Sequence, residues 1–199
     1  MKKILILLCG MSPAVITETV YAMQDDLPDR IVVLTTTEGK KCIVDELFGQ
    51  LKWAELVNFL NHKIDFYNNQ NSIRVFPAEN SDNDDILNST DAVLAMNFII
   101  ENLRQFTECS DNKIVFSISG GRKTMSVLGA LAMSFIGRKT DKLCHIVVSK
   151  PFDQTDLTPK FYFPQVGVIH NLPDGSTFLS EDAKLEFCSI PFVRQRYLF

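Results

Sequence analysis

Short apolar runs that read as β-strands alternate with stretches of helical periodicity along this chain, and this alternation restricts the folds open to it. The strand-like runs are Ile4–Leu8, Ile31–Leu34, Ile73–Phe76, Lys113–Ser117 and Leu143–Val148. Helical patterns lie between them, at Pro13–Met23, Lys41–Leu60, Thr90–Phe106 and Thr124–Gly137. Strands that alternate with helices form a mainly parallel sheet with helices on both faces. The sequence therefore predicts an α/β core over residues 1–150.

The pattern changes after Lys150. Prolines punctuate the remaining residues, and Asp174-Gly175 is a turn signal. The short apolar runs of this part are Lys160–Phe163, Val166–His170 and a strand-like segment within Ala183–Val193. We expect residues 151–199 to form a small β-rich extension of the same domain.

Composition narrows the class of protein. The chain has 199 residues, of which 46% are hydrophobic and 22% charged, which is typical of a globular domain with its own core. Its net charge of -4 argues against a protein that coats duplex nucleic acid, because such proteins present a basic face. A small anionic ligand in a local pocket stays compatible with this charge.

Neither targeting signals nor disulfide patterns are evident. The apolar run Ile4–Cys9 is too short for a signal peptide, and no segment reaches the ~20 apolar residues that span a bilayer. The five cysteines, Cys9, Cys42, Cys109, Cys144 and Cys188, are dispersed without a CxxC pair. This usage predicts reduced, structural thiols in a cytoplasmic protein with no membrane partner.

A glycine-rich turn follows the fourth strand-like run. The segment Ser119-Gly120-Gly121-Arg122-Lys123-Thr124 joins this run to a helical pattern. Such a junction directs backbone N–H groups and a helix N-terminus to one place, which suits phosphate. Cations at a helix start oppose the helix dipole, so Arg122 and Lys123 indicate an anionic ligand rather than ordinary surface charge. Because neither GxxxxGK[ST] nor GxGxxG is present, ATPase and dehydrogenase functions are disfavoured.

Three other loops are expected at the same edge of the sheet. They are Gly10-Met11-Ser12-Pro13, Thr35-Thr36-Thr37-Glu38-Gly39 and Asp82-Asn83-Asp84-Asp85. Ser12 is expected either to cap the first helix or to hold phosphate, and the two roles are compatible. For Asp82–Asp85 a solvated loop is favoured over a divalent metal site, because no calcium-loop glycine pattern accompanies it.

Metal binding by histidine is not expected. His62, His145 and His170 lie in separate elements without the spacing of a zinc site. His145 lies in an apolar strand-like run and is predicted to be a core residue.

Five segments together resemble the CARF-domain proteins (CRISPR-associated Rossmann fold) of type III CRISPR systems. They are LLCGMSPAVITETVYAM, TTTEG, SISGGRKTMS, LCHIVVS and IPFVR, and the resemblance runs from Ile4 to about Arg194. It implies a Rossmann-like fold and a homodimer that binds a cyclic oligoadenylate across its two-fold axis. Among such proteins, a stand-alone domain of this size is similar to the ring nucleases, which cleave the cyclic messenger and end the response.

The resemblance also implies roles for individual residues. Ser12 and Lys123 correspond to residues implicated in cleavage, and Gly120, Gly121, Arg122 and Thr124 correspond to the phosphate-holding turn. Further ligand contacts are expected from the other strand-end loops, at Gly10, Met11, Thr36, Thr37, Asn83 and Ser119. The chain departs from the family at Ala14, where a glutamine is frequent, so contacts of a longer side chain are lost there.

The implied reaction is an attack of a ribose 2′-OH on its own 3′-phosphate, without metal or cofactor. Cyclic tetra-adenylate is the expected substrate, and the linear product would end in a 2′,3′-cyclic phosphate. In a dimer, two copies of Arg122 and Lys123 would meet the ring while the rest of the surface stays acidic. No general base is evident among the histidines, so slow turnover is expected.

Two alternatives remain open from the sequence. The chain could be a non-catalytic sensor that binds cyclic tetra- or hexa-adenylate and regulates a partner, because binding and cleavage use the same loops. It could also be a fragment of a longer effector that carries a nuclease domain, although the IPFVR run near its end disfavours further domains.

Overall fold

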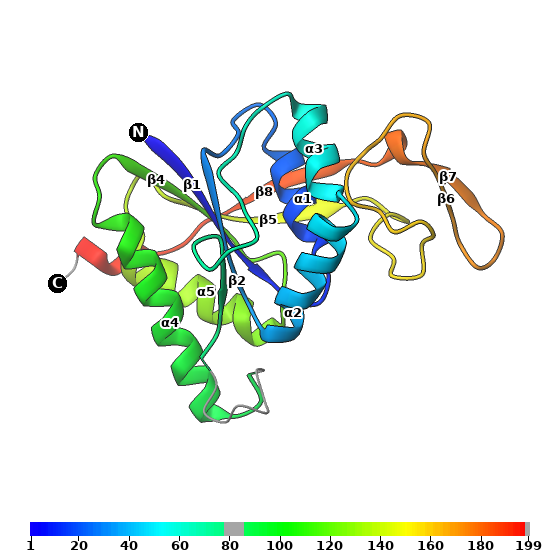
Figure 1. Ribbon diagram of the computed structural model, residues 1–199. Coiled ribbons are helices and arrows are strands. Elements are labelled where there is room, and N and C mark those ends of the chain that lie inside the picture. Colours follow the sequence, from blue (N-terminus) through cyan, green and yellow to red (C-terminus); the bar gives the residue numbers. More distant parts are fainter. Residues whose placement is uncertain (78–85, 198–199) are drawn as a thin grey trace.

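The computed structural model describes residues 1–77 and 86–197, and its centre is a six-stranded sheet (Figure 1). The strand order is β3-β2-β1-β4-β5-β8. The strands are β1 (Lys2–Cys9), β2 (Arg30–Thr35), β3 (Ile73–Val75), β4 (Asn112–Ser117), β5 (Lys142–Val148) and β8 (Leu185–Ile190). Pairings from β3 to β5 are parallel, whereas β8 runs antiparallel to β5. The predicted α/β fold class is confirmed, and each predicted strand of the core lies within two residues of an observed one.

Helices cover both faces of this sheet, as predicted. The longer ones are α1 (Ala14–Ala22), α3 (Lys52–Leu60), α4 (Ser89–Thr107) and α5 (Lys123–Ile136). In Figure 1, α4 and α5 lie on one face, and α1 and α3 lie on the other. Among the described residues, no helix is long and apolar enough to cross a bilayer.

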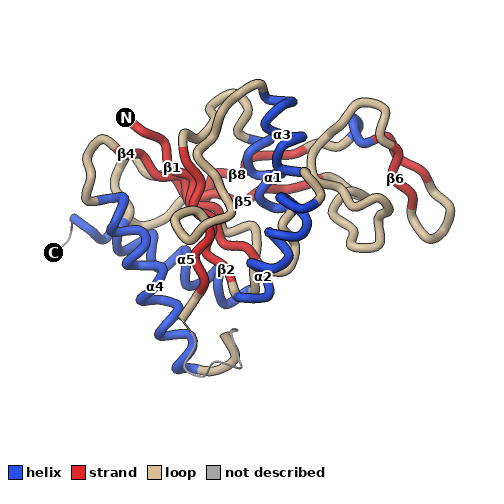
Figure 2. The backbone as a smooth tube through the Cα atoms, viewed as in Figure 1, coloured by secondary structure: helices blue, strands red, loops and turns tan. Residues whose placement is uncertain are grey.

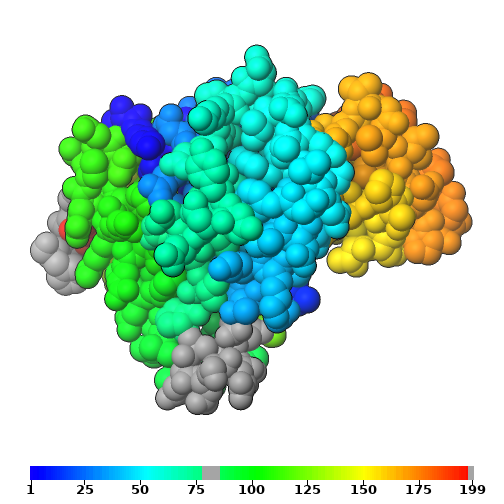
Figure 3. All heavy atoms as spheres, viewed as in Figure 1, coloured from blue at the N-terminus to red at the C-terminus, as the bar shows by residue number. Residues whose placement is uncertain are grey.

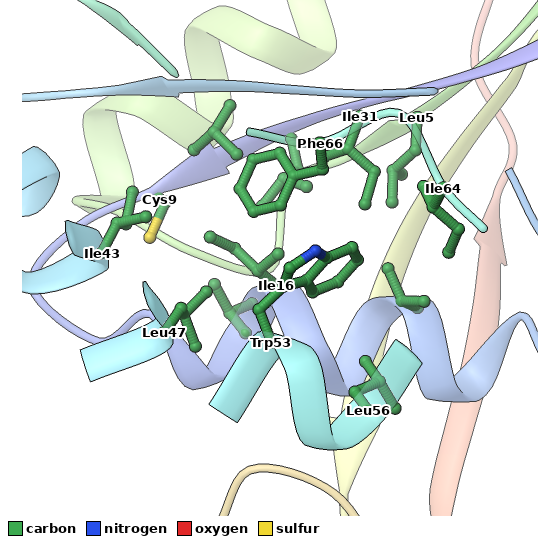
Figure 4. Close-up of a cluster of buried hydrophobic side chains, with 14 of the residues drawn as sticks. Leu5, Cys9, Ile16, Ile31, Ile43, Leu47, Trp53, Leu56, Ile64 and Phe66 are labelled. Atoms are coloured by element: carbon green, nitrogen blue, oxygen red, sulfur yellow. The ribbon is translucent and has the colours of Figure 1, made fainter. Parts of the chain in front are cut away.

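Strand β1 is buried on both faces, which is typical of the central strand of a parallel sheet. Its alternate side chains point to opposite sides. Leu5, Leu7 and Cys9 join the cluster beneath α1 and α3, and Ile4, Ile6 and Leu8 join the one beneath α4 and α5. In the first cluster, drawn in Figure 4, Trp53 of α3 packs edge-to-face on Phe66 with ring centroids 4.9 Å apart.

The helix predicted as continuous over Lys41–Leu60 is wrong in two respects. It begins earlier, at α2 (Thr37–Cys42), because the Thr36 side chain accepts a hydrogen bond from the Gly39 N–H at 3.1 Å and caps the helix. It is then interrupted, because the π-helical segment η1 (Ile43–Gly49) ends before Leu51, whose φ of 61° is left-handed and cannot continue a helix. The helical path resumes only in α3.

The predicted cap of the next helix is also wrong by two residues. Asn88, not Thr90, occupies the N-cap of α4, and its side chain accepts a hydrogen bond from the Asp91 N–H at 2.9 Å. The Asp91 carboxylate accepts a hydrogen bond from the Asn88 N–H at 3.2 Å in return. This reciprocal capping box explains why Asn88 prevails in a run of three residues that can all cap.

The predicted β-rich segment after residue 150 divides into two parts. Strands β6 (Ile169–Asn171) and β7 (Thr177–Leu179) form a separate antiparallel pair, which projects from the side of the sheet in Figures 1 and 2. This region forms the lobe at one side of the molecule in Figure 3. Lys160–Phe163 is not a strand, although Phe161, Tyr162 and Phe163 are buried. The strand-like run in Ala183–Val193 is β8, which pairs with β5 and completes the main sheet.

An ion pair between Arg138 and Asp141 joins α4, β4, α5 and β5. It lies at the amino ends of β4 and β5, at the edge of the sheet opposite the glycine turns. The Asp141 carboxylate is 1% exposed and accepts hydrogen bonds from the Ile114 N–H at 3.0 Å and the Arg138 N–H at 2.8 Å. The Arg138 guanidinium donates to the same carboxylate at 2.9 Å and to the carbonyl oxygens of Thr107, Cys109 and Asn112. A single carboxylate therefore satisfies several backbone and guanidinium donors.

We predict that Asp141→Asn lowers the free energy of unfolding by about 2–4 kcal/mol, because it leaves Arg138 buried without its counter-charge. Urea denaturation of the purified protein measures this. The control is Glu38→Gln, which removes an exposed pair with Lys41 and should change the free energy by less than about 0.5 kcal/mol. Equal stability of the two variants would contradict the assigned role of Asp141.

Candidate functional site

The strand order reverses between β1 and β4, and this creates a crevice at one edge of the sheet. After β1 the chain turns into α1 on one face, and after β4 it turns into α5 on the other. The two strands are parallel neighbours with Leu7 beside Ser117, so both turns leave from the same edge. Ligands of open α/β sheets bind at such switch points.

The turns after β1 and β4 touch through their backbones. A Cβ on Gly10 would lie 3.1 Å from the Cα of Gly121, and a Cβ on Gly120 would lie 2.5 Å from the carbonyl oxygen of Leu8. Gly121 also has a φ of +84°, which residues with side chains rarely adopt. Only residues without side chains allow this approach, which explains the glycines in both turns.

Ser119 ties the second turn to the neighbouring strand. Its hydroxyl accepts a hydrogen bond from the Ile146 N–H at 2.7 Å and lies 3.0 Å from the Ser117 hydroxyl. These contacts hold the start of the glycine turn against β5. The side chain of Ser119 therefore contributes to the rigidity of the floor of the crevice.

A cavity of about 920 Å³ lies over these turns, within the size range of small-molecule sites. The predicted site residues that line it are Gly10, Met11, Ser12, Thr36, Ser119, Gly120, Gly121 and Arg122. They come from the loops that follow β1, β2 and β4. The structure thus brings together residues that lie more than 100 positions apart in the chain.

Other predicted residues do not line this cavity. Lys123 and Thr124 are exposed in the first turn of α5, and Thr37 is half-buried at the start of α2. None of the three contributes to the cavity wall of a single chain. Asn83 and the rest of the Asp82–Asp85 loop lie outside the described residues, so the contact expected of Asn83 stays a prediction.

Ser12 does not cap the first helix. Pro13 occupies the N-cap of α1, and no side chain makes the capping hydrogen bond. Ser12 is exposed in the cavity wall instead. Of the two roles considered for its hydroxyl, capping is therefore wrong, whereas contact with a ligand is compatible with its position.

Arg122 lies at the N-cap position of α5, in extended conformation. Its N–H donates to the Met125 sulfur at 3.3 Å, which holds the turn against the helix. The positive end of the α5 dipole and the charge of Arg122 act at the same part of the cavity wall. An anionic group bound there would be stabilised by both.

Three polar residues of the wall were missed or wrongly placed by the sequence analysis. His145 is exposed and lines the cavity, so its prediction as a core residue is wrong. The reason is that β5 leaves alternate side chains uncovered near its end. Glu18 and Asp153 also line the cavity, as does Glu38 of the predicted loop after β2. The spacing of Val15 and Glu18 on one face of α1 could have indicated Glu18, whereas no signal marks Asp153 before the chain folds back.

The cavity wall carries groups of both signs. We call the wall at Arg122 and the α5 N-terminus its basic part, and Glu18 and Asp153, which interact electrostatically, its acidic part; Glu38 is a further lining carboxylate. Burial raises the pKa of Glu18 to about 7; Lys160 lowers this pKa and Asp153 raises it further. Lys160 is itself paired with Glu46, with 2.7 Å between Nζ and Oε2. Glu18 is therefore substantially protonated near neutral pH.

Cys9 and Cys144 are core residues, as predicted. Both are buried, and the Cys9 thiol donates to the Gly10 carbonyl oxygen at 3.3 Å. Burial raises the pKa of Cys9 far above its usual range and that of Cys144 to about 12, so both thiols stay protonated. Burial does not extend to all five cysteines, because Cys109 is exposed.

Within residues 1–77 and 86–197, no cluster of three or more potential metal ligands occurs.

Residues 12–199 match the family model of the CRISPR-associated protein NE0113, so the match includes every lining residue from Ser12 onward. The chain belongs to this family. The predicted membership among CARF-domain proteins of type III CRISPR systems is thereby confirmed. No curated protein shows significant similarity to the chain.

A solved structure with a similar fold is that of Enterococcus italicus Csm6 bound to cyclic hexa-2'-fluoro-hexa-dAMP. The identity is 17% and the TM-score is 0.48. The alignment covers 76% of this chain and 34% of Csm6, so this chain spans about a third of that protein.

Glu18 should make the stability of the protein depend on pH. Its folded pKa of about 7 lies above the ordinary 4.5, so the folded state holds a proton that the unfolded state releases between these values. We predict that the wild type loses roughly 1–3 kcal/mol of unfolding free energy relative to Glu18→Gln as the pH rises from 4.5 to 7. Above that window the difference should be constant.

Urea denaturation at several pH values tests this prediction. The control is Glu101→Gln on the exposed side of α4, which should follow the wild type throughout. A pH-independent difference between Glu18→Gln and the wild type would show that Glu18 titrates normally in the folded protein.

Proposed function

We propose that the chain binds a cyclic oligoadenylate in this cavity and cleaves it, acting as a ring nuclease that ends type III CRISPR signalling. The observation that carries the proposal is the convergence of the Gly10–Ser12 and Gly120–Arg122 turns on one cavity at the switch point of the sheet. Membership of a CRISPR-associated family and the resemblance of both turns to CARF motifs support the same ligand. Cyclic tetra-adenylate is the preferred substrate in this proposal.

The phosphate groups would bind at the basic part of the cavity. Backbone N–H groups at the start of α5 and the Arg122 guanidinium can donate to phosphate oxygens. A bound anion would also offset the unfavourable position of Arg122 at the positive end of the helix dipole. This explains how a chain of net charge -4 can bind a polyanion.

The cleavage step uses a nucleophile that belongs to the substrate. A ribose 2′-oxygen attacks the adjacent phosphorus, a 2′-O–P bond forms and the P–O5′ bond breaks. The 2′-OH proton is released and the leaving 5′-oxygen gains a proton, so the product ends in a 2′,3′-cyclic phosphate and a 5′-OH. Holding the ring so that the attack is in line supplies most of the catalysis. Ser12 would orient the phosphate or the attacking hydroxyl, and Lys123 would stabilise the charge that develops on the phosphate.

A two-fold dimer would explain why Lys123 lies outside the cavity wall of one chain. Helix α5 carries an exposed apolar stripe at helical spacing, formed by Val127 (59% exposed), Leu131 (46%) and Phe135 (44%). The stripe continues from Thr124, beside Lys123, so a second copy packed on it would approach the glycine turn. Two copies of Arg122 and Lys123 would then face one ring of four phosphates.

A non-catalytic sensor is the second candidate. The position of Lys123 favours this candidate, because a single chain does not place Lys123 in the cavity wall. Under this alternative the ring binds to the same turns, but no residue stabilises the transition state.

Incubation with cyclic tetra- and hexa-adenylate in the presence of EDTA separates the two candidates. We predict slow conversion of the tetra-adenylate ring to linear products ending in 2′,3′-cyclic phosphate, resolved by chromatography over time. Lys123→Ala should slow this conversion at least tenfold, roughly 1.4 kcal/mol of transition-state stabilisation. The control Lys142→Ala removes an exposed lysine at the start of β5, away from the strand ends, and should retain the wild-type rate.

Rings that stay intact after long incubation with excess protein would exclude the nuclease and leave the sensor. Cleavage by Lys123→Ala at the wild-type rate would instead remove Lys123 from the mechanism while retaining the activity.

A further inference from the structure

The acidic part of the cavity requires an explanation that phosphate binding does not give. Glu18 is half-buried in the wall, and Asp153 lies in the same wall after β5 has ended. No ion pair among the described residues includes Glu18, and Lys160, which acts on Glu18 electrostatically, is paired with Glu46 at 2.7 Å. An ionised carboxylate at this place would repel the phosphates of a ring, and a protonated carboxyl group would not attract them. The acidic part of the wall is therefore better suited to an uncharged portion of the ligand.

Glu18 and the glycine turns line the same cavity. Ser12 of the β1–α1 turn and Val15 and Glu18 of α1 all contribute to its wall. Within α1, Val15 and Glu18 are three residues apart and lie on one side of the helix, about 4.5 Å apart along its axis. A nucleotide whose phosphate lies at the glycine turns would therefore share this cavity with Glu18.

The donors and acceptors of adenine fit a neutral carboxyl group. The Watson–Crick and Hoogsteen edges of adenine both present the N6 amino donor beside a ring-nitrogen acceptor, and glutamine pairs with the N6/N7 edge through two hydrogen bonds. A protonated glutamate offers the same pair of groups as glutamine, a carbonyl oxygen that accepts and an O–H that donates. An ionised carboxylate offers acceptors only and would face the lone pair of the ring nitrogen.

We infer that Glu18, in its protonated form, recognises the adenine base of the ligand and is the residue that determines base specificity. This inference rests on the proposed function, because it assumes that a nucleotide ring occupies the cavity. Val15 would contact the base between Glu18 and the phosphate site, from the same side of α1.

The surroundings of Glu18 favour the protonated form at pH values up to about 7. Burial is the largest influence and raises its pKa to about 7. The groups that face Glu18 are Asp153, which raises this pKa, and Lys160, which lowers it. Lys160 also forms an ion pair with Glu46 of η1. Binding through protonated Glu18 should therefore weaken as the pH rises through this value.

Binding of uncleavable rings tests the inference independently of the nuclease activity. The ligands are the 2′-fluoro form of cyclic tetra-adenylate and its analogue with hydrogen in place of each 6-amino group. Their dissociation constants are measured by calorimetry at pH 6 and pH 8.5, for the wild type, Glu18→Gln, Glu18→Ala, Arg122→Ala and Glu101→Gln. Thermal unfolding of each variant establishes that it is folded.

The wild type should bind the adenine ring at least about tenfold more tightly than the analogue at pH 6, since a buried partner is left unpaired in the analogue complex. Its affinity for adenine should fall by about 5- to 30-fold at pH 8.5. Glu18→Gln should keep the preference at both pH values, and Glu18→Ala should lose the preference but still bind both rings. Arg122→Ala should weaken both rings equally, and Glu101→Gln should match the wild type.

A wild-type preference for adenine that survives in Glu18→Ala would overturn this inference and leave the proposed function intact. So would equal affinity of the wild type for the two rings. Failure of the wild type to bind either ring at either pH would overturn the proposed function as well.

Discussion

The architecture depends on the close approach of two backbone turns at the ends of β1 and β4. Gly10 and Gly121 lie so close that a Cβ added to Gly10 would be 3.1 Å from the Cα of Gly121. This approach lets α1 and α5 start beside each other on opposite faces of one sheet. This approach also fixes where the two helices start, where the Arg122 side chain lies and where the cavity forms over them. A side chain at these glycines would separate the turns and remove the floor of the site.

The distribution of charge in this cavity explains how an acidic protein can bind a nucleotide. The net charge of -4 describes the whole chain, whereas a ligand meets only the cavity wall. There the start of α5 suits phosphate, and the half-buried carboxyl of Glu18 suits a neutral, donor-bearing group. A ligand with phosphate at one end and an amino-substituted base at the other satisfies both. In this account, affinity comes from the glycine turns and specificity from α1.

Local patterns predicted the elements and the loops of the site. The apolar runs of β1, β2 and β4 are buried on both faces, so they are visible without knowledge of their partners. The turn Ser119–Arg122 was predictable because glycines and cations have a local meaning at a strand–helix junction. What the sequence missed depends on contacts between distant residues. The helix break at Leu51 accompanies the packing of Trp53 on Phe66, and the pairing of β8 with β5 spans about 40 residues. Asp153 joins the wall only because the chain folds back after β5.

In the proposed function, two copies of this chain share one cyclic oligoadenylate across a two-fold axis. Native mass spectrometry of the protein with uncleavable 2′-fluoro cyclic tetra-adenylate measures this stoichiometry. We expect one ring for every two chains, and loss of both the dimer and the bound ring in Leu131→Asp, which places a charge in the exposed stripe of α5. One ring bound to each monomeric chain would show that the site is not shared.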